Sequence, residues 1–356
     1  MINILLAGGM SLLLTLVATP RFIQFLTVRQ YGQFIREDGP KEHLIKRGTP
    51  TMGGLVIVSS VIVAYFLSHL ILWKPITMSA ILLLGLMAGM AFLGFMDDWA
   101  KITQERSLGL TPRGKLIGQF IIGGLFAFLA LHFPDERGIR PASQFVSFLR
   151  DLNWLHLPMI IAIIWITFLI MAWSNAVNLT DGLDGLSSGS LTLVFSAYAL
   201  INLWHFNQWC SRASTAGPRC YEARDPHDLA VIALALAGAC FGFLWWNAKP
   251  AKIFMGDTGS MGLGGALAGL SVLTRTELLL VILGFLFVME AGSVALQVAY
   301  FKSTGGKRIF KMSPIHHHFE LLGWQEVTVT IRFWIICGLC VALGIGAFYA
   351  EWVVGQ

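Results

Sequence analysis

The chain has 356 residues, of which 56% are hydrophobic and only 13% are charged, and its mean hydropathy is +0.69. Soluble domains carry about 25% charged residues, so this composition excludes an ordinary soluble protein and indicates a polytopic membrane protein. The formal net charge of +5 suits anionic lipids and anionic substrates, and it does not single out nucleic acid as a partner.

Apolar runs of about 18 residues or more predict spanning helices, because such a helix satisfies its own backbone hydrogen bonds in the bilayer. We predict an all-α membrane protein with about ten transmembrane helices in a single integral-membrane domain, residues 1–356. The helices are expected near residues 2–26, 53–73, 77–96, 115–133, 158–175, 187–205, 229–246, 259–273, 277–300 and 328–351. Glu290 lies inside the ninth run, which predicts a bend or an acid presented to a cavity; a structural acid with a partner is an equal alternative.

The distribution of basic residues predicts the orientation in the membrane. Loops 27–52, 97–115, 247–258 and 301–332, with Arg21, hold roughly 17 of the 25 Lys and Arg residues. The positive-inside rule then makes these loops cytoplasmic and places both termini in the periplasm of a bacterial inner (cytoplasmic) membrane. Several arginines break the bias, because Arg137, Arg140, Arg212, Arg219 and Arg224 fall on the outside.

Two of the five cysteines, Cys210 and Cys220, share one predicted external loop. They are expected either to form a disulfide in an oxidising compartment or to stay reduced, with equal weight.

Carboxylates, amides and histidines gather at the ends of the apolar runs, all on the predicted cytoplasmic side. Asp97 and Asp98 close the run that begins near Met78, and adjacent residues of a helix point about 100° apart, so their roles must differ. Asp257 lies in a Gly-Asp-Thr-Gly-Ser turn, where a carboxylate near Asp97 or Asp98 would suit Mg²⁺. The glycines after Asp257 predict close helix packing rather than a dinucleotide site.

The segment 175–185 places Asn178, Asp181 and Asp184 at spacings of three, without a basic residue. This pattern predicts a face or a loop that binds hydroxyl groups or helps to hold a cation, against capping alone.

Three consecutive histidines, 316–318, cannot share one helix face, so they predict a loop that holds phosphate, donates a proton or binds a metal. A basic rim around these sites would attract a pyrophosphate-bearing substrate; it comprises Lys41, Lys46, Arg47, Lys101, Arg113, Lys115, Lys249, Lys252, Lys307, Arg308 and Lys311.

Five segments together resemble the phospho-N-acetylmuramoyl-pentapeptide transferases, a branch of the polyprenyl-phosphate sugar-1-phosphate transferases. They are Lys46-Arg-Gly-Thr-Pro-Thr-Met-Gly-Gly54, Phe95-Met-Asp-Asp-Trp99, Asn175-Ala-Val-Asn-Leu-Thr-Asp-Gly-Leu-Asp-Gly185, Phe254-Met-Gly-Asp-Thr-Gly-Ser260 and Met312-Ser-Pro-Ile-His-His-His-Phe-Glu320. The resemblance covers nearly the whole chain in order, and the histidine segment resembles the muramoyl-pentapeptide branch in particular.

The resemblance implies transfer of phospho-MurNAc-pentapeptide from its UDP carrier to undecaprenyl phosphate, which gives lipid I and UMP and requires Mg²⁺. It implies that Asp257 is the metal ligand and that Asp97 and Asp98 are essential acids, one of which deprotonates or orients the lipid phosphate. It also implies a homodimer, for which the sequence locates no interface. The implied substrate contacts are catalytic His316 and substrate-binding Lys46, Thr51, Asn178, Asp181, Asp184, Asn247, His317 and His318.

Two alternatives stay open at this point. A sister transferase that uses UDP-GlcNAc would share the acids and differ in the histidine segment. A transporter for an anionic metabolite would place ionisable residues near the middle of the bilayer and often shows inverted repeats, neither of which this sequence has.

Overall fold

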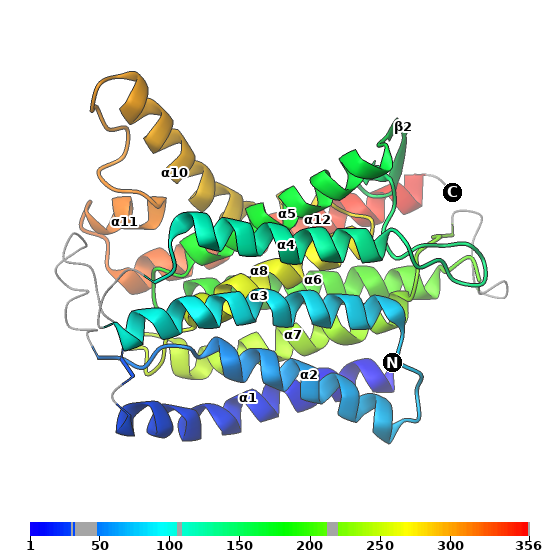
Figure 1. The fold of residues 1–356 in the computed structure, drawn as a ribbon, viewed down its shortest axis with the longest axis horizontal. Coiled ribbons are helices and arrows are strands. Elements are labelled where there is room, and N and C mark those ends of the chain that lie inside the picture. The colour runs from blue at the N-terminus through cyan, green and yellow to red at the C-terminus, as the bar shows by residue number, and fades with distance from the viewer. Residues whose placement is uncertain (30, 33–47, 105–108, 212–219, 355–356) are drawn as a thin grey trace.

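The computed structural model describes residues 1–29, 31–32, 48–104, 109–211 and 220–354. These residues form a helical bundle with one small sheet (Figure 1). The elements are α1 (Ile2–Val28), α2 (Gly54–Ile71), α3 (Met78–Thr103), α4 (Pro112–Ala130), β1 (Phe145–Ser147), β2 (Asp151–His156), α5 (Met159–Thr180), α6 (Leu186–Asn207), α7 (Pro226–Asn247), α8 (Gly256–Leu273), α9 (Leu279–Leu283), α10 (Phe285–Ser303), α11 (Ile315–Glu320) and α12 (Glu326–Val354).

Nine helices in the described ranges, α1 to α7, α10 and α12, are long and apolar enough to cross a membrane. The tenth long helix, α8, has 18 residues, but Asp257 and several glycines make it less apolar. Every residue of α8 from Thr258 to Leu273 is buried, so this helix lies inside the bundle and not against lipid. The prediction of an all-α polytopic membrane protein with about ten long helices is confirmed.

Glycines allow the neighbouring helices to approach α8 closely. A Cβ atom added to Gly94 of α3 would lie 2.1 Å from the carbonyl oxygen of Asp257, and one added to Gly54 of α2 would lie 2.0 Å from the nitrogen of Gly259. An added Cβ on Gly262 would lie 2.9 Å from that of Ala91. The predicted use of small residues for helix packing is therefore confirmed, and it fixes the first turn of α8 against α3.

The ninth apolar run does not form one helix. It is divided at Gly284 into the short α9 and the longer α10, which leans away from the bundle (Figure 1). The bend predicted for this run is confirmed, but it falls at Gly284 and not at Glu290, which is fully buried and paired with His316.

The bundle has two ends with different side chains. The acidic end carries Asp97, Asp98 and Asp257; the disulfide end carries the Cys210–Cys220 bond and the connection between α6 and α7. Figure 1 shows the start of α1 and the end of α12 together at the disulfide end. The hairpin β1–β2 also lies there and adds one small sheet to the otherwise helical architecture.

Candidate active site

Helices α3 and α8 bring three aspartates together at the acidic end. One carboxylate oxygen from each of Asp97, Asp98 and Asp257 lies within 4.8 Å of the others. Asp97 and Asp98 are only 3% and 2% exposed. Helix α3 continues to Thr103, so the expectation that the two adjacent acids end their helix is wrong: they lie more than a turn before its end. The prediction that Asp257 lies near Asp97 and Asp98 is confirmed.

Asp98 caps the first turn of α8. Its carboxylate accepts hydrogen bonds from the backbone nitrogens of Asp257 (3.1 Å) and Thr258 (2.9 Å) and from the Thr258 hydroxyl (2.8 Å). A negative charge at a helix N-terminus is stabilised by the unpaired N–H groups and by the helix dipole. Asp98 therefore orients the turn that carries Asp257, whereas Asp97 accepts from the backbone nitrogen of Leu110 (2.9 Å) and faces Lys101.

Two lysines partly neutralise the aspartates. Lys101 Nζ lies 2.6 Å from Asp97 Oδ2 and 3.0 Å from Asp257 Oδ2, and Lys115 Nζ lies 2.6 Å from the same Asp257 oxygen. From the sequence, both lysines were assigned only to the general basic rim, and their direct contacts with the aspartates were not predicted. The helical spacing of Asp97 and Lys101, four residues apart, was the available signal for one of them.

The end of α5 adds an amide and a further acid. Asn178 Nδ2 donates to Asp257 Oδ1 (2.6 Å) and to the hydroxyl of Ser260 (2.8 Å), which places it in the site as predicted. Asp181 follows α5, and burial together with the nearby Asp257, Asp98 and Asp184 raises its pKa to about 8. Asp181 thus lies near other acids, whose negative charge a bound cation would offset.

The cluster has the donor chemistry of a site for a hard cation. Mg²⁺ takes oxygen ligands at about 2.0–2.1 Å and usually binds one or two carboxylates together with substrate phosphates and water. Asp97 and Asp257 present carboxylate oxygens toward one point that the ammonium group of Lys101 already reaches. The acids therefore fit a divalent cation, with Asp257, the predicted ligand, at their centre.

The other predicted contacts divide into those near the aspartates and those used in packing. The Thr51 hydroxyl lies beside Gly256, where an added Cβ would be 2.9 Å from it and 2.6 Å from Asp98. Asn247 is 3% exposed and uses its side chain within the protein, accepting from the Ser188 hydroxyl (2.8 Å) and donating to the carbonyl of Ile253 (3.0 Å).

Asp184 is also inward-facing, because its carboxylate accepts from the backbone nitrogen of Ala251 (3.0 Å) and its own nitrogen donates to Glu326 (2.9 Å). In the structure Asp184 and Asn247 thus hold the segments around the site. Lys46, the remaining predicted contact, lies outside the described residues.

The three histidines lie on the short helix α11, so the prediction of a loop is wrong. The reasoning about faces holds, because the three rings have different surroundings. His316 is fully buried with Nδ1 3.0 Å from Glu290, His317 Nδ1 lies 2.7 Å from Glu320, and His318 Nδ1 accepts from the backbone nitrogen of Lys311 (3.1 Å).

His316 connects α11 to the segment after α5. A Cβ atom on Gly182 would lie 2.4 Å from His316 Nε2, so only glycine fits beside this ring. Glu290 is therefore a structural acid with a partner, one of the two alternatives that the sequence left open. The ring of His316 is held between α10 and residues 181–184.

Comparisons with known proteins agree with this site. The model of glycosyl transferase family 4 matches residues 80–275, and signature 1 of phospho-N-acetylmuramoyl-pentapeptide-transferase matches residues 46–58. The chain is 62% identical over 354 residues to the phospho-N-acetylmuramoyl-pentapeptide-transferase of Cutibacterium acnes, covering 99% of both chains. It is 56% identical to those of Beutenbergia cavernae, over 100% of both chains, and Streptomyces avermitilis, over 98% of both.

Proposed function

Because the chain belongs to the phospho-N-acetylmuramoyl-pentapeptide-transferase family, we propose that it transfers phospho-MurNAc-pentapeptide from UDP-MurNAc-pentapeptide to undecaprenyl phosphate. The products are lipid I and UMP, in the first membrane step of peptidoglycan synthesis. The observation that carries the proposal is the convergence of Asp97, Asp98 and Asp257 with two lysines at one end of a membrane-spanning bundle.

Phosphoryl transfer needs reactants held in line and charge neutralised around the transferred phosphorus. Lys101 and Lys115 supply mobile positive charge next to Asp257, and they can follow the phosphate oxygens of a bound substrate. Asp97 has a carboxylate oxygen near the same point, so it is placed to orient the lipid phosphate and accept its proton. Asp98 is engaged by three donors from α8, so its role is to position Asp257.

Mg²⁺, when bound, would polarise the phosphoryl oxygens and offset their negative charge. Asp257 and Asp97 are the residues that would hold it, with Asn178 fixing the Asp257 carboxylate by its 2.6 Å hydrogen bond. Asp181 and Thr51 border this cluster and would contact the substrate. His316, His317 and His318 would contact its phosphate or sugar portion from α11, with His316 set in place by Glu290.

We also propose an orientation of the chain in the membrane and the compartment that its acidic end faces. The acidic end lies next to loops rich in Lys and Arg, so it faces the cytoplasm of a bacterial inner membrane, and both termini face the periplasm. An undecaprenyl tail can then stay in the bilayer while its phosphate meets a soluble nucleotide. Residues 1–356 act as one transferase domain in this arrangement, because α8 packs against helices from both halves of the chain. Pairing of two copies remains a prediction.

The test is UMP release by the detergent-purified chain with undecaprenyl phosphate and Mg²⁺. UDP-MurNAc-pentapeptide and UDP-GlcNAc are compared as donors, each with and without EDTA. We expect EDTA-sensitive release with the muramoyl donor alone. Release with UDP-GlcNAc instead would move the chain to the sister transferases, and no release with either donor would overturn the proposal.

A further inference from the structure

We propose that a cavity at the disulfide end, lined by four arginines, binds the phosphate group of an anionic ligand. The cavity has a volume of about 800 Å³, which is large enough for a headgroup-sized molecule. Arg137 and Arg140 come from the connection after α4, Arg150 from the β1–β2 turn, and Arg275 from the segment after α8. We call the cavity lined by these four residues the arginine cavity.

The arginine cavity is separate from the active site. Helix α8 begins at Gly256, next to the aspartates, and ends at Leu273, just before Arg275. Eighteen helical residues span about 27 Å, so the two sites lie at opposite ends of one buried helix. A substrate phosphate held at Asp257 cannot also reach the arginines, and phosphoryl transfer therefore gives them no role.

The positions of these arginines run against the charge bias of the chain. Basic residues concentrate in the loops at the acidic end, and positive charge at the opposite side of a membrane protein is disfavoured during insertion. Among the described residues, four arginines and no lysine nevertheless line one cavity. Guanidinium groups offer planar pairs of N–H donors that match phosphate and carboxylate oxygens, which lysine does not.

Acidic partners hold three of the guanidinium groups in place. Arg137 pairs with Asp135 (2.8 Å), Arg150 with Glu351 (3.0 Å) and Arg275 with Asp151 (3.0 Å). These pairs reduce the net positive charge, and the lining also includes the acid Glu222, so recognition must depend on directed hydrogen bonds more than on net charge. Each arginine has five N–H donors, and one carboxylate does not use them all.

Unused donors remain at the cavity wall. Arg140 is exposed, and the described residues provide it with no ion pair. A phosphate monoester has three free oxygens and up to two negative charges, so it can accept from guanidinium groups on several sides at once. Guanidinium groups from separate segments around one cavity therefore favour phosphate.

A buried histidine lines the same cavity. His205, near the end of α6, is 2% exposed, and neither ring nitrogen has a hydrogen-bond partner among the described residues. Its ring packs against those of Tyr221 and Phe348, with ring centroids 4.2 and 5.3 Å away. Both ring nitrogens are buried, so a ligand in the cavity does not reach them, and His205 contributes to the wall by packing.

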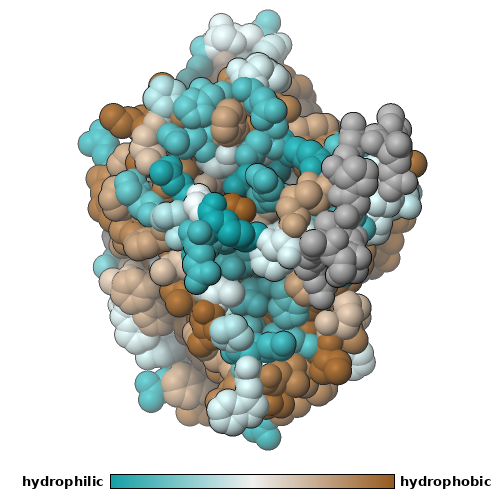
Figure 2. Space-filling view, turned by 90° about the vertical axis from the view of Figure 1, so that its right-hand side faces the viewer, coloured by the Kyte–Doolittle hydropathy of each residue, from teal (hydrophilic) through white to brown (hydrophobic). Residues whose placement is uncertain are grey.

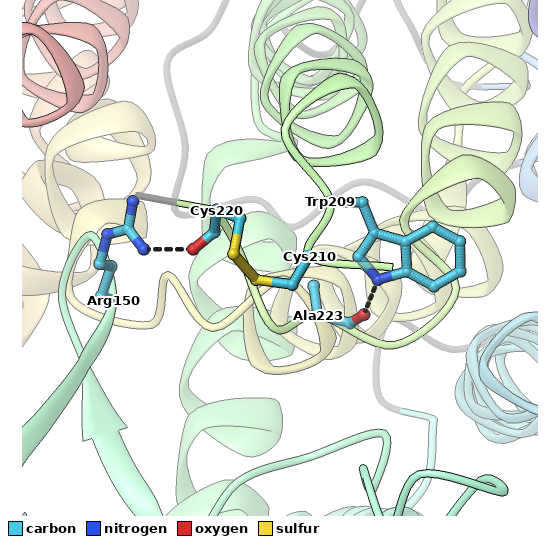
Figure 3. Close-up of a disulfide and its surroundings, with 5 residues drawn as sticks. All are labelled: Arg150, Trp209, Cys210, Cys220 and Ala223. Atoms are coloured by element: carbon cyan, nitrogen blue, oxygen red, sulfur yellow. Dashed lines mark hydrogen bonds between the residues drawn. A yellow bond between two sulfur atoms is a disulfide. The ribbon is translucent and has the colours of Figure 1, made fainter. Parts of the chain in front are cut away.

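Cys210 and Cys220 line one side of the cavity, and Figure 3 shows the bond between them. Cys210 and Cys220 are bonded, and beside them Trp209 Nε1 donates to the Ala223 carbonyl (2.8 Å) and Arg150 donates to the Cys220 carbonyl (2.9 Å). The wall is thus set before any ligand arrives, which lowers the entropy lost on binding. Figure 2 shows this end of the molecule, where hydrophilic residues gather over the middle and apolar residues surround them.

Two sources can supply the phosphate: a phospholipid headgroup at the membrane surface or a soluble phosphate ester. The experiment separates them by calorimetric titration of the detergent-purified chain with three probes. Glycerol 3-phosphate has the phosphate alone, dihexanoylglycerol has the acyl chains alone, and dihexanoyl phosphatidic acid has both. We expect both phosphate probes to bind and dihexanoylglycerol not to bind. Tighter binding of phosphatidic acid identifies a lipid as the source, and equal binding identifies a soluble ester.

Variants assign the binding to the cavity. Arg140→Glu should weaken phosphate binding by about tenfold or more, because it replaces donors by a repelling charge. It should leave UMP release unchanged, and Arg21→Glu, at an exposed arginine of α1 outside the cavity, is the matched charge control. Lys115→Ala should retain binding. Absence of phosphate binding, equal binding of dihexanoylglycerol, or binding lost in Lys115→Ala and kept in Arg140→Glu would each overturn the proposal. The assay measures no turnover, so its outcome is independent of the transferase activity.

Discussion

The acidic end and the disulfide end use charge in opposite ways. At the acidic end, carboxylates converge on one point and share two lysines, so their negative charge is only partly offset. At the disulfide end, three of the four arginines that line the cavity each have an acid beside them. An incompletely compensated cluster is suited to recruiting a cation and a reacting phosphate, whereas a compensated one holds donors in fixed directions.

The two ends are also held by different means. Close helix contacts at Gly54 and Gly94 fix the first turn of α8, and Asp98 caps it. The disulfide end depends on turns, a hairpin and the Cys210–Cys220 bond. Side chains on packed helices are positioned more precisely than those on loops, so chemistry suits the acidic end and binding suits the other.

The largest expected effect separates the two ends by activity. Asp257→Ala should lower UMP release by about 10³-fold or more, because it removes the central ligand of the proposed metal and the partner of Lys115. The variant should remain folded, since capping of α8 by Asp98 uses the backbone of Asp257 and not its side chain. Steady-state UMP release and size-exclusion chromatography are the measurements. Arg140→Ala is the control at the opposite end and should turn over normally; normal turnover of Asp257→Ala would remove the metal assignment.

A smaller loss of activity is expected from α11. His317→Ala should reduce turnover by about 10²-fold, the low end of what one positioned acid–base group contributes. His317 Nδ1 lies 2.7 Å from Glu320, which fixes the ring, so Glu320→Gln should give a weaker effect in the same direction. Initial rates over a range of UDP-MurNAc-pentapeptide concentrations give kcat and KM for both variants. Unchanged kinetics for His317→Ala would assign this histidine to structure.

The acidic end was largely predictable from the sequence, for a physical reason. Charged residues at the ends of apolar runs are expensive, so Asp97, Asp98 and Asp257 stood out without any knowledge of their distances. A helix that crosses the membrane places each of its ends at one of the two membrane faces. The motifs at helix ends could therefore be assigned correctly to the same end of the bundle. The resemblance of five motifs to a known family added the reaction itself.

Pair contacts were not predictable. Lys101 and Lys115 looked like ordinary loop lysines until packing placed them beside Asp257, and Glu290 gained its partner only when α11 folded back on α10. Asn247, predicted as a substrate contact, has its side-chain oxygen and nitrogen engaged within the protein. The sequence shows Arg137 and Arg140 against the charge bias, but only the fold brings Arg275, from a distant segment, to the same cavity.

The disulfide gives a prediction about stability alone. The Cys210→Ser, Cys220→Ser double variant should lose about 2–3 kcal/mol of unfolding free energy, the entropic value for a loop with a sequence separation of 10. Turnover should stay normal, because the bond lies at the far end of α8 from Asp257. Thermal unfolding in detergent, with and without a reducing agent, measures the change. A large loss of turnover at unchanged stability would show that the two ends are coupled and do not act separately.

The smallest expected effect is a dependence of stability on pH, which also arises at the disulfide end. Glu277 follows α8 and is 4% exposed; it accepts from the backbone nitrogen of Ser147 (3.0 Å) and from Trp165 Nε1 (3.3 Å). Burial, reinforced by Asp151, raises the pKa of Glu277 to about 7 from its usual 4.5. The folded state therefore holds this proton more tightly than the unfolded state does.

The sign follows directly. The stabilisation is complete below about pH 4.5 and is lost as the pH rises through 7, where the folded protein must ionise a buried acid. Its size is on the order of 1–2 kcal/mol once water penetration is allowed for. Glu277→Gln keeps an acceptor for Ser147 and Trp165 and does not ionise, so its melting temperature should fall less than that of the unaltered chain between pH 5 and pH 8. Glu136→Gln, at an exposed acid of the same end, is the control. Equal pH profiles for Glu277→Gln and the unaltered chain would mean that Glu277 is already ionised at pH 5 and that its hydrogen bonds outweigh its burial.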